Sequence, residues 1–146
     1  MKSNQNTVFH LSIHVNDLEA SRAFYAGVLG CQEGRSTQRW VDFDFFGHQL
    51  SVHLGTPTAS TLTGEVDGAA VPMPHFGAVL PLEIWQAVAD RLQKAGTEYL
   101  LDPQERYPDE TGAQRILFVR DPSGNAIELK CLQNHAELFE SSPHAP

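Results

Sequence analysis

Hydrophobic and polar residues follow first a strand pattern and then a helix pattern near the start of the chain. Residues 8–15 alternate as a strand does, and apolar side chains recur at helical spacing over 18–29. Asn16-Asp17 offers this helix an N-cap, and Gly30 offers it a left-handed C-cap. Further strands are predicted near 31–35 and over 39–46 and 49–54, the last two joined at Gly47-His48.

The same order of elements begins again at residue 74. A strand is predicted over 75–80, and Pro81 starts a helix that Gly96 ends. Three more strands are predicted over 99–101, 115–120 and 126–132, with a turn at Asp121-Pro122-Ser123-Gly124 between the last two. The chain therefore reads as two βαβββ modules, 8–54 and 74–132, joined by a Thr/Gly/Ala-rich linker over 55–73.

This repeat predicts an α+β fold within a single domain, residues 1–146. One βαβββ module cannot cover its own curved sheet, so it has to pair with another module around a central cleft. Function is expected in that cleft, although a duplication without chemistry is the alternative. Residues 103–110 are expected to form an exposed connection, and 134–140 either a short helix or a frayed end.

Composition narrows the range of partners. The chain has 146 residues, of which 41% are hydrophobic, and its formal charge is -8 with a pI near 5.2. That charge disfavours nucleic acid and anionic membrane surfaces, so a small molecule is the expected partner. Cys31 and Cys131 are too few for a disulfide framework and are expected to be reduced core residues. The start of the chain lacks the apolar core of a secretion signal, so a cytoplasmic location is expected.

Four residues predict a divalent metal site: His10, His53, His75 and Glu128. They stand at matching places in the two modules, on first and last strands. Strand alternation places each of them on the face opposite the aliphatic residues. Taken singly, a histidine or glutamate on a strand is more often a core or surface residue. Their joint recurrence favours a metal, which would also offset the cost of burying Glu128 between Ile127 and Leu129.

The chain resembles the vicinal oxygen chelate superfamily, which includes glyoxalase I, extradiol dioxygenases, and fosfomycin and bleomycin resistance proteins. The resemblance spans residues 8–132, and its most specific stretches are 10–18, 23–30 and 121–129. It implies that His10 and His53 from the first module, with His75 and Glu128 from the second, hold a divalent ion (Fe, Zn, Ni, Co or Mn). It also implies a homodimer.

Two reaction types follow from two ligand sets. His10, His75 and Glu128 alone would form the open two-histidine, one-carboxylate triad of non-haem Fe(II) oxygenases. With His53 as a fourth ligand the site would resemble glyoxalase I, a lyase in which the metal acts as a Lewis acid. His14 stands where glyoxalase I has an arginine, and Phe118 where extradiol enzymes have a tyrosine, so the substrate stays open.

Further roles are assigned from the same patterns. Glu128 and His14 are the predicted catalytic residues, with His14 either a base beside the metal or a hydrogen-bonded wall residue. Ser12 and Phe118 are expected to line the substrate cavity. The alternative function is a metal-free protein that sequesters a drug or another small molecule, as the resembling bleomycin resistance proteins do.

Overall fold

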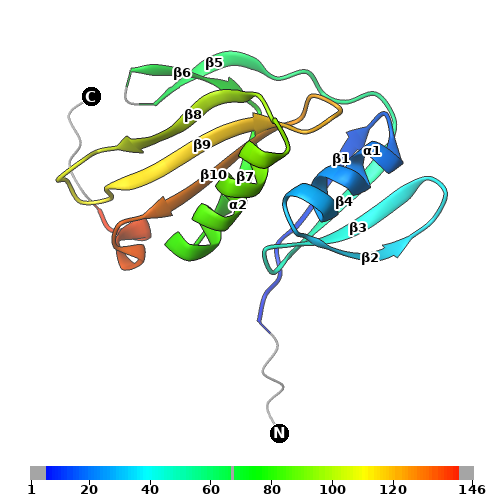
Figure 1. Cartoon of the computed structure of the whole chain (residues 1–146), viewed down its shortest axis with the longest axis horizontal. Coiled ribbons are helices and arrows are strands. Elements are labelled where there is room, and N and C mark those ends of the chain that lie inside the picture. The colour runs from blue at the N-terminus through cyan, green and yellow to red at the C-terminus, as the bar shows by residue number, and fades with distance from the viewer. Residues whose placement is uncertain (1–5, 67, 142–146) are drawn as a thin grey trace, which may run out of the picture. The chain divides into compact units, whose positions relative to one another are not determined.

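The computed structural model describes residues 6–66 and 68–141. Its chain divides into two compact units, Met1–Thr58 and Ala59–Pro146 (Figure 1). Each unit combines a curved mixed sheet with a helix, so the predicted α+β class is confirmed. The predicted assembly of the two modules into one domain stays a prediction.

The first unit has the predicted order of strand, helix and three strands. Its sheet runs β1-β4-β3-β2, with β1 parallel to β4 and the other neighbours antiparallel. The elements are β1 (His10–Val15), α1 (Leu18–Arg22), the π-helix η1 (Ala23–Val28), β2 (Gln32–Ser36), β3 (Trp40–Phe45) and β4 (His48–Leu54).

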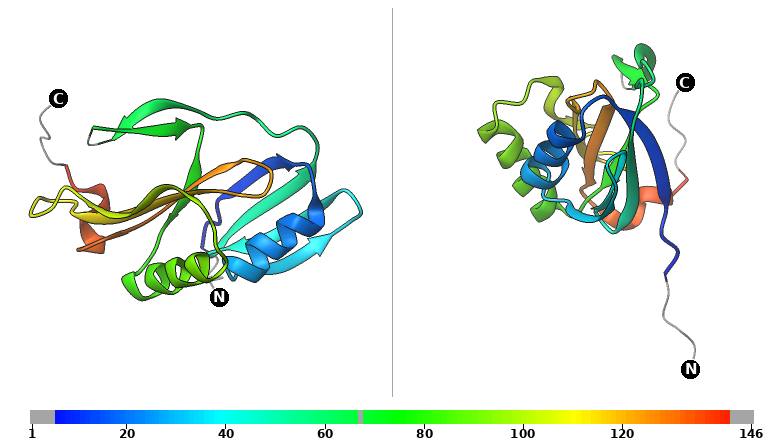
Figure 2. Two further views of the ribbon diagram at one scale, coloured as in Figure 1. Left: turned by 45° about the horizontal axis from the view of Figure 1, so that its top comes forward. Right: turned by 90° about the vertical axis from the view of Figure 1, so that its right-hand side faces the viewer.

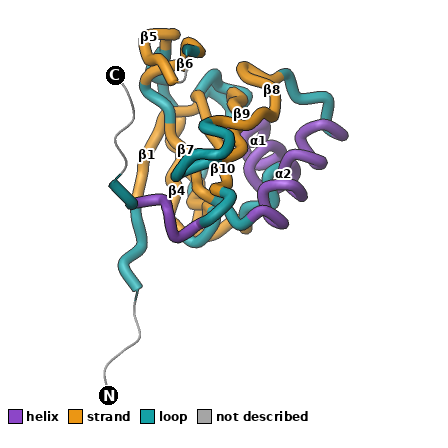
Figure 3. Tube along the Cα trace, turned by 90° about the vertical axis from the view of Figure 1, so that its left-hand side faces the viewer, coloured by secondary structure: helices purple, strands orange, loops and turns teal. Residues whose placement is uncertain are grey.

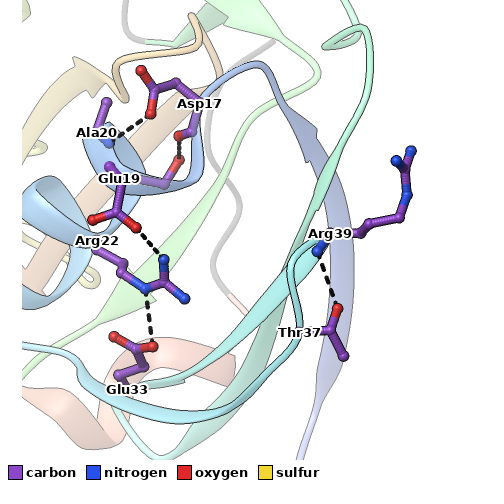
Figure 4. Close-up of polar contacts among 8 residues, drawn as sticks. Asp17, Glu19, Ala20, Arg22, Glu33, Thr37 and Arg39 are labelled. Atoms are coloured by element: carbon purple, nitrogen blue, oxygen red, sulfur yellow. Dashed lines mark hydrogen bonds and ion pairs between the residues drawn. The ribbon is translucent and has the colours of Figure 1, made fainter.

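The predicted helix over 18–29 is present, but its second half is a π-helix. Asp17 caps the start of α1, because its carboxylate accepts a hydrogen bond from the Ala20 amide at 3.0 Å. Arg22, in the last turn of α1, pairs with Glu19 and donates from Nε to Glu33 at 3.0 Å (Figure 4). Arg22 thereby ties the helix to β2, which carries Glu33.

One face of this sheet packs against the helix. Val41 and Phe43 of β3 and Leu50 and Val52 of β4 are buried there. The Tyr25 ring of η1 lies 5.3 Å from the Phe43 ring, centroid to centroid. The first hydrophobic core therefore lies between η1 and the sheet, and the alternate residues of each strand are left to the opposite face.

The second unit repeats the arrangement and adds a hairpin. Its main sheet runs β7-β10-β9-β8, with β7 parallel to β10. Helix α2 packs on one face of this sheet (Figure 3). There the Trp85 indole Nε1 donates to the Leu129 carbonyl at 2.9 Å. The elements are β5 (Thr61–Val66), β6 (Ala69–Met73), β7 (Phe76–Val79), α2 (Leu82–Lys94), β8 (Tyr99–Arg106), β9 (Gln114–Arg120) and β10 (Ala126–Leu132).

The range 55–73, for which no strand was predicted, contains the β5–β6 hairpin. The hairpin covers the sheet face opposite α2, as Figure 2 shows. Val71 of β6 forms a buried cluster with Ile116 and Phe118 of β9. Abundant threonine, glycine and alanine concealed these strands, since they weaken the apolar alternation that marks a strand.

The expectation of an exposed connection over 103–110 is wrong for its first part. Strand β8 continues to Arg106, and the Arg106 side chain is buried with 7% of its surface exposed. Pro103 inside the strand suggested an end, yet β8 is the edge strand of its sheet, where a missing N–H costs no ladder bond. Pairing with β9 also shifts register between Leu101 and Gln104.

The end of the described chain is a 3₁₀ helix, η2 (His135–Phe139), capped by the Asn134 side chain. Cys31 and Cys131 are both buried core residues, as predicted, and burial raises the pKa of the Cys131 thiol. Among residues 6–66 and 68–141, no helix combines the length and apolar character needed to cross a bilayer.

Gly77 of β7 lies directly opposite Glu128 of β10, and a Cβ at position 77 would overlap the Glu128 carbonyl. We expect Gly77→Ala to lower the free energy of unfolding by about 2–3 kcal/mol or more, because the two backbones would have to separate. Urea denaturation measures the change. Gly27→Ala is the control, since nothing lies within 4 Å of a Cβ there. Equal stability of the Gly77→Ala protein and wild type would contradict the close approach.

Candidate functional site

The polar face of the first sheet carries the predicted residues of the first module. In the parallel pair of β1 and β4, His10 lies opposite Gln49, Ser12 opposite Ser51 and His14 opposite His53. Directly opposite residues of neighbouring strands point to the same side. The predicted orientation, away from the helix-packed core, is therefore confirmed for His10, Ser12, His14 and His53.

The same register separates His10 from His53. Their positions along the strands are offset by four residues, which is about 13 Å. Gln49 is the β4 residue directly opposite His10. Gln49 is not among the predicted ligands, because strand parity alone does not give register. A parallel pairing of 10–15 with 49–54, residue for residue, would have revealed it.

Gln49 belongs to a hydrogen-bonded group centred on Asp42 of β3. Asp42 has 8% of its surface exposed, and its carboxylate accepts hydrogen bonds from Ser51 Oγ at 2.5 Å and Gln49 Nε2 at 3.2 Å. Arg35 lies 3.9 Å from the same carboxylate. The Gln49 amide nitrogen is thus engaged, and its carbonyl oxygen is the atom left to bind a ligand. A cavity of about 440 Å³ is lined partly by Asp42 and Gln49.

The histidines of this face have different surroundings. His10 Nε2 lies 3.2 Å from Ser12 Oγ. The His14 ring covers Gly55, where a Cβ would come within 2.7 Å of His14 Cδ2. The His53 ring lies 6.3 Å from the indole of Trp40, tilted by 32°. His14 and His53 are therefore packed side by side near the ends of β1 and β4.

The second unit carries His75, Phe118 and Glu128 on its sheet face opposite α2. The His75 Nδ1 lies 2.6 Å from the Pro72 carbonyl oxygen, and the His75 ring meets the Phe118 ring edge to face at 5.0 Å. Glu128 lies opposite Phe118 in the ladder and is 9% exposed. Phe118 thus lies beside both predicted ligands of this unit.

The Pro72 contact fixes the protonation pattern of His75. A carbonyl oxygen only accepts hydrogen bonds, so Nδ1 carries the proton when the ring is neutral, and Nε2 carries the lone pair. A metal-binding histidine usually has its other ring nitrogen held in this way. In the neutral ring of His75 the lone pair is therefore on Nε2.

Lys130, two residues beyond Glu128, places a positive charge on the same face. Its ammonium nitrogen lies 3.3 Å from Glu128 Oε1. This ion pair compensates the buried carboxylate without any metal. A cation approaching Glu128 would have to compete with the ammonium group.

Phe118 has none of its surface exposed, because the β5–β6 hairpin covers it. Its predicted place in a substrate cavity stays a prediction, as does that of Ser12. Within either unit, the residues that the structure describes include no group of three or more His, Cys, Asp or Glu able to hold a metal. The predicted ligands are divided between the units, with His10 and His53 in the first and His75 and Glu128 in the second.

A family model described as the glyoxalase/bleomycin resistance protein/dioxygenase superfamily matches residues 7–129. The chain belongs to this superfamily, as the sequence resemblance implied. No curated protein matches the sequence closely enough to add a more specific relationship.

Solved structures show the same fold. A glyoxalase/bleomycin resistance protein/dioxygenase from Alicyclobacillus acidocaldarius is 28% identical with a TM-score of 0.74, covering 94% of this chain and 99% of that one. A lactoylglutathione lyase from Agrobacterium tumefaciens is 18% identical with a TM-score of 0.62, covering 94% and 98%. A fosfomycin resistance protein from Listeria monocytogenes is 18% identical with a TM-score of 0.62, covering 92% and 99%.

We expect Asp42→Asn to destabilise the protein by about 1–3 kcal/mol, because an amide oxygen cannot replace both carboxylate oxygens as acceptors for Ser51 and Gln49. Thermal and urea unfolding measure the loss. Asp44→Asn is the matched control, since Asp44 is exposed and its amide variant still accepts from the Gly47 N–H. If both variants unfold alike, Asp42 does not organise this face.

Proposed function

We propose that the chain is a divalent-metal-dependent enzyme of the glyoxalase and dioxygenase type, acting on a small substrate through two neighbouring oxygens. The observation that carries the proposal is His75, whose Nδ1 is held by the Pro72 carbonyl while its ring lies against Phe118, the residue opposite Glu128. The proposal requires His10 of the first unit to share the metal with His75 and Glu128, in one chain or in two chains of a homodimer.

The donor set suits the expected metals. Two imidazoles and a carboxylate are ligands for Fe, Zn, Ni, Co or Mn. When bound, such an ion supplies Lewis acidity that stabilises negative charge on substrate oxygens. The sequence suggested His53 as fourth ligand, whereas the strand register favours Gln49, because Gln49 lies opposite His10. An amide oxygen is a harder ligand than an imidazole nitrogen, and the ion would be bound more weakly with it.

The chain's own residues supply the remaining chemistry. His14 is the proposed proton acceptor, and its neighbour His53 lies on the same face of the sheet. Ser12, which contacts His10, and Phe118, which contacts His75, are proposed to border the bound substrate. The lactoylglutathione lyase among the similar structures is consistent with a lyase or isomerase reaction. The superfamily description also includes dioxygenases, so an oxygenase reaction of Fe(II) is the other candidate.

A second function is favoured by one observation, the ion pair of Lys130 with Glu128. If the ammonium group permanently compensates the carboxylate, the protein holds no metal and binds its small molecule without reaction. The two functions make opposite predictions for metal affinity.

We expect wild-type protein to bind Co(II) at one ion per chain, and His75→Ala to weaken binding at least tenfold, because it removes the nitrogen that is held ready for the metal. Titration followed by visible absorption and elemental analysis measures affinity and stoichiometry. His135→Ala is the control, since His135 is exposed on η2. Equal binding by the His75→Ala protein and wild type would overturn the ligand assignment.

The same titration identifies the fourth ligand. The register predicts a larger loss of affinity for Gln49→Ala than for His53→Ala. The reverse order would restore His53 to the ligand set.

Removing the charge that competes at Glu128 separates the two functions. We expect Lys130→Gln to tighten Co(II) binding several-fold, because it removes the ammonium group that pairs with the Glu128 carboxylate. Absence of Co(II) binding in both wild type and Lys130→Gln would favour the metal-free sequestering function.

A further inference from the structure

The β5–β6 hairpin is attached to the second unit differently from the strands of its main sheet. Among the described residues, β5 and β6 pair with each other, and no backbone hydrogen bond joins either strand to β7, β8, β9 or β10. The chain has no regular secondary structure just before the hairpin, over 56–60, or just after it, at 74–75. The hairpin can therefore change position without breaking the ladder of the main sheet.

Polar contacts hold the hairpin at its base. Arg120 of β9 donates from Nη1 to Ser60 Oγ at 2.9 Å and to the Gly124 carbonyl at 2.8 Å. These bonds fix the residue that precedes β5. At the end of the hairpin, His75 Nδ1 lies 2.6 Å from the Pro72 carbonyl oxygen in β6. Both strands are thus anchored where the hairpin joins the rest of the unit.

Apolar contacts hold the body of the hairpin on the sheet. Val71 of β6 is fully buried in a cluster with Ile116 and Phe118 of β9. Val66, the last residue of β5, packs against the same cluster. Gly64, opposite Val71, contributes no side chain. Because a two-stranded hairpin is only marginally stable by itself, its position depends on this small cluster.

The hairpin covers the sheet face that carries the candidate site residues of this unit. Phe118 has none of its surface exposed, and Glu128, directly opposite it on β10, is 9% exposed. A small molecule cannot reach the Phe118 ring while the hairpin lies on the sheet. Access requires the hairpin to lift, and the covers of active sites are drawn from elements of low local stability for this reason.

We propose that the β5–β6 hairpin is a hinged flap, which lifts from the sheet about its base while the main sheet and α2 stay folded. Lifting separates Val66 and Val71 from β9 and exposes Ile116 and Phe118. Burial of the same apolar surface closes the flap again. The motion itself does not depend on a bound metal. The role of the flap as the entrance to Glu128 rests on the proposed function.

Thiol labelling of the full chain, in the presence of a chelator, tests the flap. Val71→Cys puts a thiol on the inner face of the hairpin, and Ile116→Cys, made separately, puts one on the sheet beneath it. Val119→Cys is the matched control, because Val119 is fully buried on the opposite face of β9. Mass spectrometry of the peptides gives the rate at each position, which is divided by the rate of the same thiol in urea-unfolded protein.

We expect the thiols at positions 71 and 116 to react at similar rates, each about tenfold or more faster than the thiol at position 119, because the flap opens more often than the unit unfolds. Low concentrations of urea should raise the rate at 119 most, since global unfolding exposes more surface. Val66→Ala should raise the rate at 71 several-fold. Leu62→Ala should leave it unchanged, because Leu62 is exposed on β5.

Equal rates at positions 71 and 119 would overturn the proposal, since the hairpin would then leave the sheet only when the unit unfolds. Labelling at 71 with full protection at 116 would also overturn it, because the sheet face would stay covered. If Val71→Cys does not fold, the comparison of positions 116 and 119 decides the question. Absence of Co(II) binding by wild-type protein would remove the proposed function without changing these rates, so the two failures are distinguishable.

Discussion

Each unit depends on one parallel strand pair, β1 with β4 in the first and β7 with β10 in the second. Parallel neighbours keep opposite residues on the same side, so these pairs sort the side chains of both strands into two faces. One face is apolar and covered by a helix. In the first unit the Phe43 ring packs against the Tyr25 ring, and in the second the Leu129 carbonyl accepts a hydrogen bond from the Trp85 indole. The other face carries the histidines and Glu128. The separation of the hydrophobic core from the candidate site residues therefore follows from the two parallel strand pairs.

The second unit modifies this plan, because its polar face is partly covered by the β5–β6 hairpin. Phe118, fully buried beneath Val71, still contacts His75 and lies opposite Glu128. The carboxylate is thereby kept from water, which strengthens any electrostatic interaction it makes. Either the Lys130 ammonium group or a divalent cation can compensate the negative charge of the buried Glu128 carboxylate. Which of the two does so decides whether this superfamily member is a metalloenzyme.

Sequence patterns predicted the elements wherever apolar spacing was regular, as at residues 10–15 and 82–94, and parity placed His10 on the correct face. The patterns did not predict which residues of β1 and β4 lie opposite each other, because shifting β4 by two residues leaves each of its side chains on the same face of the sheet. Gln49 was overlooked for that reason. Arg106 was expected in a solvated connection because prolines and charges surround it, whereas in the structure it lies beside Gln114 of β9, which pairs with Leu132 of β10, and both are distant from it in sequence. Long-range packing of this kind leaves no local signature.

Pro103 gives β8 a further property. A strand that joined the outer edge of this sheet would need a continuous row of backbone donors, and the ring nitrogen interrupts that row. The register shift beside it bends the edge as well. Growth of the sheet by strand addition is thus discouraged along β8, so copies of the chain that associate through backbone pairing have to do so along a different edge.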